Sequence, residues 1–103
     1  MLAILMVAAA MEIGGDAAIR HGLVRSGWPS VVLGAALLVG YGLVVNTDRS
    51  IDFGRLMGLY IAVFFVVSQV VSAALFGQWP SGAVMAGGAL IVAGGAVIHL
   101  AAH

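Results

Sequence analysis

The sequence predicts an all-α membrane protein with four transmembrane helices per chain, assembled as an antiparallel homodimer of eight helices. Of its 103 residues, 63% are hydrophobic and only 8% are charged, and the mean hydropathy is +1.18. Soluble domains carry about 25% charged residues, so this chain cannot cover an aqueous surface. Four apolar stretches of about 20 residues each leave room only for short loops and tails. The whole chain, residues 1–103, is therefore expected to form a single domain.

The first two helices are expected over residues 2–21 and 29–46. A signal peptide is the competing interpretation of the first stretch. Signal peptides open on basic residues, whereas the first basic residue here is Arg20 and acids interrupt the apolar run. The segment HGLVRSGWPS, residues 21–30, is expected to be a loop. Pro29 suits the first turn of the second helix, where its missing N–H costs nothing.

The third and fourth helices are expected over residues 55–76 and 82–100. The loop before the third helix, residues 46–55, holds half of the charged residues of the protein, namely Asp48, Arg49, Asp52 and Arg55. Trp79 in the following GQWPS turn suits a membrane interface. These bounds complete four spans joined by three short loops.

The basic residues do not favour one orientation in the membrane. Arg20 and Arg25 lie near the first loop, and Arg49 and Arg55 lie near the second, on the opposite side. A chain without a charge bias can insert both ways, which would supply the two copies of an antiparallel homodimer. A fixed orientation, set by weaker cues such as the terminal amine, is the alternative.

Glu12 is the most informative residue. Eleven residues precede it, which places it ~16 Å along the helix and about half way through a ~30 Å hydrocarbon core. An acid at that depth is costly and normally faces a cavity on an ion or proton path. Desolvation disfavours the charged carboxylate and an arriving cation favours it, so protons and cations compete for this group. The alternative is a protonated Glu12 that only hydrogen-bonds a neighbouring helix.

Asp16 and Arg20 follow Glu12 at spacings of four residues, so the three share one helical face. Pairing of Asp16 with Arg20, whose head can reach the loop by snorkelling, is the favoured interpretation. The alternative is that Asp16 supplies a second carboxylate to the substrate.

Aromatic and polar residues in the third helix are further candidates for the site. Tyr60, Phe64 and Ser68 recur every four residues. Ring faces attract cations, and the Tyr60 phenol can hold Glu12 by a hydrogen bond. Aromatic residues at this spacing also serve simple packing, and Ser68 equally suits interhelical hydrogen bonding. Tyr41 in the second helix is a weaker candidate of the same kind as Tyr60.

Glycines in the fourth helix predict the dimer interface. Gly87 and Gly94 lie seven residues apart, as do Gly88 and Gly95. Such a ridge of small residues allows another helix backbone to approach closely. We therefore expect helix–helix association through these four positions.

The sequence contains no sign of an enzyme. It has no phosphate-binding GxxxxGK[ST] pattern, no visible catalytic triad, no Cys and only three scattered His, so no catalytic residue, cofactor or metal site is expected. A formal net charge of zero argues against a nucleic-acid partner. The expected partners are the lipid bilayer, a second copy of the chain, protons and a small cationic substrate.

Several motifs together resemble the small multidrug resistance (SMR) family. They are A-x-E-x-G-G around Glu12, GWPSV before the second helix and FGQ after the third, in register with four short spans over essentially the whole chain. The resemblance implies an antiparallel, dual-topology homodimer that exports cations by alternating access. It also implies that Glu12 is the shared proton and cation site, with Arg20 as the basic residue of the first helix and Tyr60 as the aromatic residue of the third.

The chain departs from the SMR pattern in two places. Met57 and Tyr60 stand where tyrosine and tryptophan are usual, and Asp16 replaces a small or uncharged residue. The segment GRLMGLYIAVF, which begins at Gly54, is similar to the G-R-x-x-x-x-Y pattern of YnfA-type proteins. These form a related branch of the same drug/metabolite transporter superfamily.

The sequence therefore predicts a proton-coupled antiporter in the cell (inner) membrane that exports small organic cations of quaternary ammonium or guanidinium type. The alternative is a non-transporting membrane subunit that packs against a partner through its Gly-rich helices. A passive channel is disfavoured because no helix has a continuous polar stripe.

Overall fold

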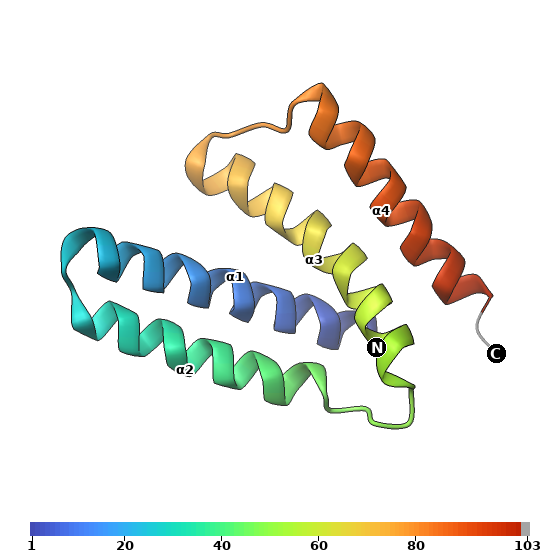
Figure 1. The fold of residues 1–103 in the computed structure, drawn as a ribbon, viewed down its shortest axis with the longest axis horizontal. Coiled ribbons are helices and arrows are strands. Elements are labelled where there is room, and N and C mark those ends of the chain that lie inside the picture. Colours follow the sequence, from blue (N-terminus) through green and yellow to red (C-terminus); the bar gives the residue numbers. More distant parts are fainter. Residues whose placement is uncertain (102–103) are drawn as a thin grey trace. The chain divides into compact units, whose positions relative to one another are not determined.

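The structure, a computed structural model that describes residues 1–101, contains four α-helices within that range (Figure 1). They are α1 (Leu2–Arg25), α2 (Trp28–Val45), α3 (Phe53–Phe76) and α4 (Gly82–Leu100). All four are long and apolar enough to cross a membrane. The shortest has 18 residues, about 27 Å of helix, which is close to the ~30 Å hydrocarbon core. The predicted all-α class with four candidate membrane spans is confirmed.

The chain divides into two compact units, each an antiparallel helical hairpin. Residues 1–48 contain α1 packed against α2, and the second unit, which begins at Arg49, contains α3 packed against α4. Each hairpin is described by itself below.

Helix α1 is longer than the sequence predicted. It continues to Arg25 through residues 21–25, which were expected to be part of a loop. Nothing stops the helix before Ser26, which adopts the left-handed conformation at φ 55°. The Gly22 carbonyl then accepts a hydrogen bond from the Gly27 N–H at 2.8 Å, which closes the helix end. Pro29 lies in the first turn of α2, as predicted.

Side-chain caps set the start of both later helices. α3 begins at Phe53, two residues before the predicted start, because the Asp52 carboxylate accepts a hydrogen bond from the Arg55 backbone N–H at 3.2 Å. The Ser81 hydroxyl accepts one from the Val84 N–H at 3.2 Å, and α4 then spans the predicted residues.

In the first hairpin the two helix backbones touch at glycine. A Cβ on Gly34 would lie 2.6 Å from the Gly15 carbonyl oxygen, and a Cβ on Gly15 would lie 2.9 Å from the Gly34 oxygen. Nearer the loop, the Ser30 hydroxyl donates a 2.7 Å hydrogen bond to the Ala18 carbonyl. Without side chains at the crossing, α1 and α2 gain close backbone packing, the main source of helix association in lipid.

In the second hairpin, glycines of α4 receive side chains of α3. A Cβ on Gly88 would collide with the Phe65 ring, and a Cβ on Gly95 would collide with the Ala62 Cβ. At the other end of the hairpin, a Cβ on Gly58 of α3 would lie 2.5 Å from the Ile98 Cδ1 atom. Small residues therefore bring this pair of helices together too.

Substitution of Gly95 by Ala is expected to destabilise the second hairpin by about 1–3 kcal/mol, because the added methyl meets the Ala62 Cβ and forces the helices apart. Gly94→Ala is the matched control, since nothing lies within 4 Å of its added methyl and Ala is the better helix former. Unfolding by SDS, followed by circular dichroism in a detergent that keeps the chain monomeric, measures both. Equal loss of stability in the two variants would contradict this packing.

Candidate functional site

The structure places Glu12 near the middle of the first candidate span. It is the eleventh residue of the 24-residue helix α1, ~15 Å from the start of a helix of ~36 Å, and it is half-buried. Gly15, three residues further along and on the same side of α1, carries no side chain that could cover it. In a membrane span of this length, the middle of the helix is expected at the depth where water is scarcest.

Tyr41 of α2 interacts with Glu12 across the first hairpin. The interaction is electrostatic and joins the Glu12 carboxylate and the Tyr41 phenol. Side chains lean toward the N-terminus of their own helix, and because α1 and α2 are antiparallel, these two lean toward each other. The sequence analysis ranked Tyr41 below Tyr60. The heptad spacing of small residues in both helices is the signal that could have placed Tyr41 higher.

Asp16 and Arg20 are both exposed on α1. Within residues 1–101 the structure forms no ion pair between them, although this pairing was the favoured interpretation. A spacing of four permits such a pair without enforcing it, and exposed ion pairs contribute only about 0–1 kcal/mol. A role for Asp16 toward a substrate stays a prediction.

On α3 the aromatic candidates form a pair. Tyr60 is 4% exposed, and its ring centroid lies 6.0 Å from that of the half-buried Phe64, with the ring planes at 53°. This tilted arrangement is within the favourable range for aromatic pairs. The Ser68 hydroxyl donates to the Phe65 carbonyl of the same helix at 2.7 Å. The Tyr60 and Phe64 rings therefore form a pair along the predicted stripe, whereas the Ser68 hydroxyl forms a hydrogen bond within its own helix.

The glycine ridge of α4 divides between two directions. Gly88 and Gly95 are buried and face α3. Gly87 and Gly94 face open space, with nothing within 4 Å of an added Cβ. Of the four glycines predicted for a dimer interface, Gly87 and Gly94 are therefore the two that the hairpin leaves accessible.

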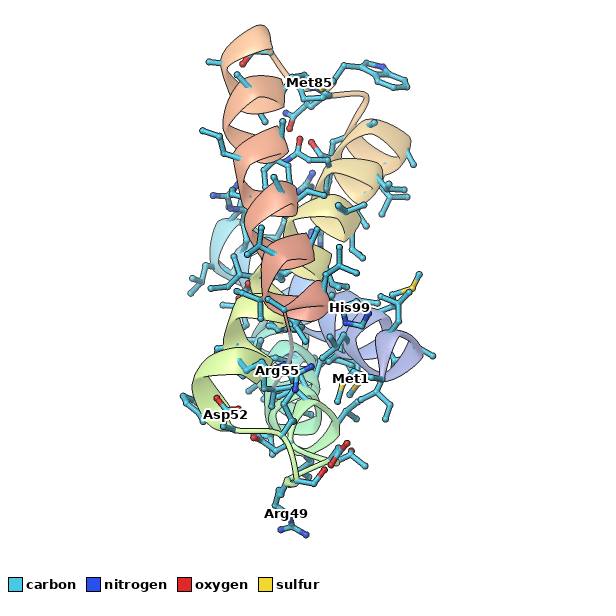
Figure 2. All side chains as sticks on the ribbon, turned by 90° about the vertical axis from the view of Figure 1, so that its right-hand side faces the viewer. Met1, Arg49, Asp52, Arg55, Met85 and His99 are labelled. Atoms are coloured by element: carbon cyan, nitrogen blue, oxygen red, sulfur yellow. The ribbon has the colours of Figure 1, made fainter. Side chains whose placement is uncertain are left out.

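Charged residues gather at one end of the α3–α4 hairpin. Figure 2 shows Arg49, Asp52 and Arg55 at this end together with His99, away from Met85 at the start of α4. The Nε of Arg55 is buried and has no hydrogen-bond partner among the residues described. Among all the residues that the structure describes, no three His, Asp or Glu side chains lie close enough together to hold a metal ion. Because charged groups are costly inside a bilayer, this end of the hairpin is expected at the membrane–water interface.

Two curated membrane proteins are similar to the chain over nearly its full length. It is 35% identical over 101 residues to a UPF0060 membrane protein of Frankia casuarinae, covering 97% of this chain and 92% of that protein. It is 32% identical over 101 residues to a UPF0060 membrane protein of Rhodococcus erythropolis, covering 97% and 94%. No family model matches the chain, and no solved structure matches it. Four candidate spans and these two relatives together assign the chain to the UPF0060 family of YnfA-like, multi-pass membrane proteins.

Proposed function

We propose that this protein is a proton-coupled exporter of small organic cations, with Glu12 as the shared site for the proton and the cation. The observation that carries the proposal is the half-buried carboxylate in the middle of α1, which interacts electrostatically with a phenol of α2. Acids at this depth are costly and mark ion or proton paths in membrane proteins. The resemblance of the motif around Glu12 to the SMR family supports the same role.

Competition between two positive species for one carboxylate couples their movements. A deprotonated Glu12 attracts the cation, and protonation removes the charge that holds it. When the site opens to one side and then to the other, proton uptake releases the bound cation, which yields exchange. The ring faces of Tyr60 and Phe64 suit the recognition of a poorly hydrated cation, and each such contact contributes about 0.5–2 kcal/mol.

A homodimer with oppositely oriented copies would complete the site. Four helices enclose little volume, whereas eight can surround two Glu12 carboxylates at the midplane. The equal division of Arg residues between the two sides supports insertion in both orientations. The open glycines Gly87 and Gly94 offer a surface for close contact between α4 helices.

Replacement of Glu12 by Gln is expected to abolish exchange. Reconstituted vesicles with a pH gradient measure it, as uptake of radiolabelled tetraethylammonium or guanidinium into the acidic interior. Glu12→Gln should reduce the rate at least tenfold, a loss of about 1.4 kcal/mol or more. Asp48→Asn, which also removes one carboxylate but at an exposed position in the loop between α2 and α3, is the matched control and should transport at roughly the wild-type rate. Undiminished transport by Glu12→Gln would remove the mechanism.

Cation binding is expected to weaken as the pH falls. Protonation neutralises Glu12, so affinity drops by up to tenfold per pH unit wherever the carboxyl is mostly protonated. Isothermal titration with tetraethylammonium at a series of pH values from about pH 4 to about pH 8 measures the change. Binding should be tighter at higher pH, and Glu12→Gln should remove the pH dependence. Equal affinity across this range in the wild-type protein would rule out competition at this residue.

Association of two copies is expected to depend on the open face of α4. Gly94→Leu should lower the cross-linked dimer yield severalfold, because it fills the surface that a second backbone would contact. Ala96→Leu, also at an exposed position of α4 but on a different face, is the control and should leave the yield unchanged. Cross-linking in lipid vesicles measures both. An obligatory partner of different sequence would instead favour a non-transporting subunit.

A further inference from the structure

Small residues recur every seven positions on α1, at Ala8, Gly15 and Gly22, and the facing segment has Gly27 at the N-cap of α2 and Gly34 seven residues later. Gly22 meets Gly27, whose carbonyl oxygen would lie 2.7 Å from a Cβ on Gly22. Seven residues earlier on α1 and seven later on α2, Gly15 meets Gly34. A heptad repeat keeps such positions on the seam between two helices over several turns. The seam therefore holds the two backbones in contact over at least two levels.

The same seven-residue spacing, continued by one more repeat on each helix, reaches the region of Glu12. Seven residues before Gly15 is Ala8, which is completely buried, and seven after Gly34 is Tyr41. By this register Tyr41 is expected opposite the Ala8 methyl group, about one helical turn from Glu12. The electrostatic interaction of Glu12 with Tyr41 agrees with this register.

The contact at the second level tolerates no side chain on α2. A Cβ on Gly34 would lie 2.6 Å from the Gly15 oxygen and 2.9 Å from the Ile19 backbone nitrogen, whereas ordinary contact begins at 3.4 Å. Both are backbone atoms, which cannot rotate away as a flexible side chain would. An added methyl must separate the helices by about 1 Å. Tyr41 lies on the same face of α2 only ~10 Å further along, so the separation displaces it from Glu12.

We propose that Gly34, in contact with Gly15, is a positioning residue for the cation site: it holds α2 close enough to α1 for the Tyr41 phenol to fix the Glu12 carboxyl group. The role toward the cation rests on the proposed function. The contact between Glu12 and Tyr41 does not, and it can be measured without any substrate.

Infrared spectroscopy measures that contact directly. At acidic pH the C=O stretch of protonated Glu12, identified by its loss in Glu12→Gln, reports hydrogen bonding to the carboxyl group. Gly34→Ala is expected to shift this band in the same direction as Tyr41→Phe. An unshifted band in Gly34→Ala would overturn the positioning role.

Two controls separate positioning from general damage to the hairpin. Gly42→Ala changes the same helix at a position with nothing within 4 Å. Gly22→Ala introduces an equally severe clash, 2.7 Å from the Gly27 oxygen, but ~15 Å along α1 from Glu12. Both should leave the Glu12 band unchanged, and a shift in Gly22→Ala as large as that in Gly34→Ala would contradict a local role. If Gly34→Ala does not fold, Gly15→Ala provides a milder separation, because its closest backbone contact is 2.9 Å.

A double-mutant cycle then tests the effect on the cation. Gly34→Ala and Tyr41→Phe should each weaken tetraethylammonium affinity about fivefold, and the double variant should bind no more weakly than Tyr41→Phe alone. Additive losses would show that Gly34 acts by another route and would overturn the proposal. Binding that is unaffected by Glu12→Gln would instead refute the proposed function, while the infrared result would still decide the positioning role.

Discussion

Close approach of helix backbones at glycine is the constraint on which each hairpin depends. Inside a bilayer the lipid chains are as apolar as leucine, so burial of large side chains gives helices little reason to associate. Dispersion between closely packed atoms and polar contacts must supply the attraction. The Gly15–Gly34 crossing brings backbone to backbone, and the Ser30 hydroxyl adds a polar tie to the Ala18 carbonyl. The position of Glu12 and Tyr41 follows from that packing.

The two hairpins use their glycines in different ways. In the first, glycines meet glycines, so both helices contribute to one close seam. In the second, glycines receive side chains: Gly88 and Gly95 of α4 receive Phe65 and Ala62 of α3, and Gly58 of α3 receives Ile98 of α4. Gly87 and Gly94 of α4 have nothing within 4 Å of an added Cβ and so take no part in the packing of this hairpin. This division is the basis for the proposal that they contact a second copy.

Local signals in the sequence predicted the four helices well. Apolar length set the spans, Pro29 set the start of α2, and the Ser81 side chain suited the start of α4. The end of α1 was predicted incorrectly, because Arg25, two Gly and the Trp-Pro pair in residues 21–30 were taken to indicate a loop, although residues 21–25 contain no Pro and the helix accommodates Gly22. Position along the chain was enough to place Glu12 near the middle of the first span.

Features that depend on tertiary register could not be predicted in the same way. The partner of Glu12 across the hairpin depends on which residue of α2 faces it, and this required the Gly15–Gly34 crossing. The heptad of glycines in α4 predicted a close contact but not which of its two rows faces α3. Likewise, the Asp16–Arg20 spacing allowed an ion pair, but over the residues it describes the structure forms none between these two side chains.

The connection between α1 and α2 has a practical consequence for handling the protein. Only Ser26 and Gly27 separate the two helices, and the Gly27 N–H is bonded back to the Gly22 carbonyl. An epitope or fluorescent tag inserted there would pull apart both the turn and the glycine seam beneath it. The longer segment between Val45 and Phe53 is the internal site where foreign sequence can be accommodated.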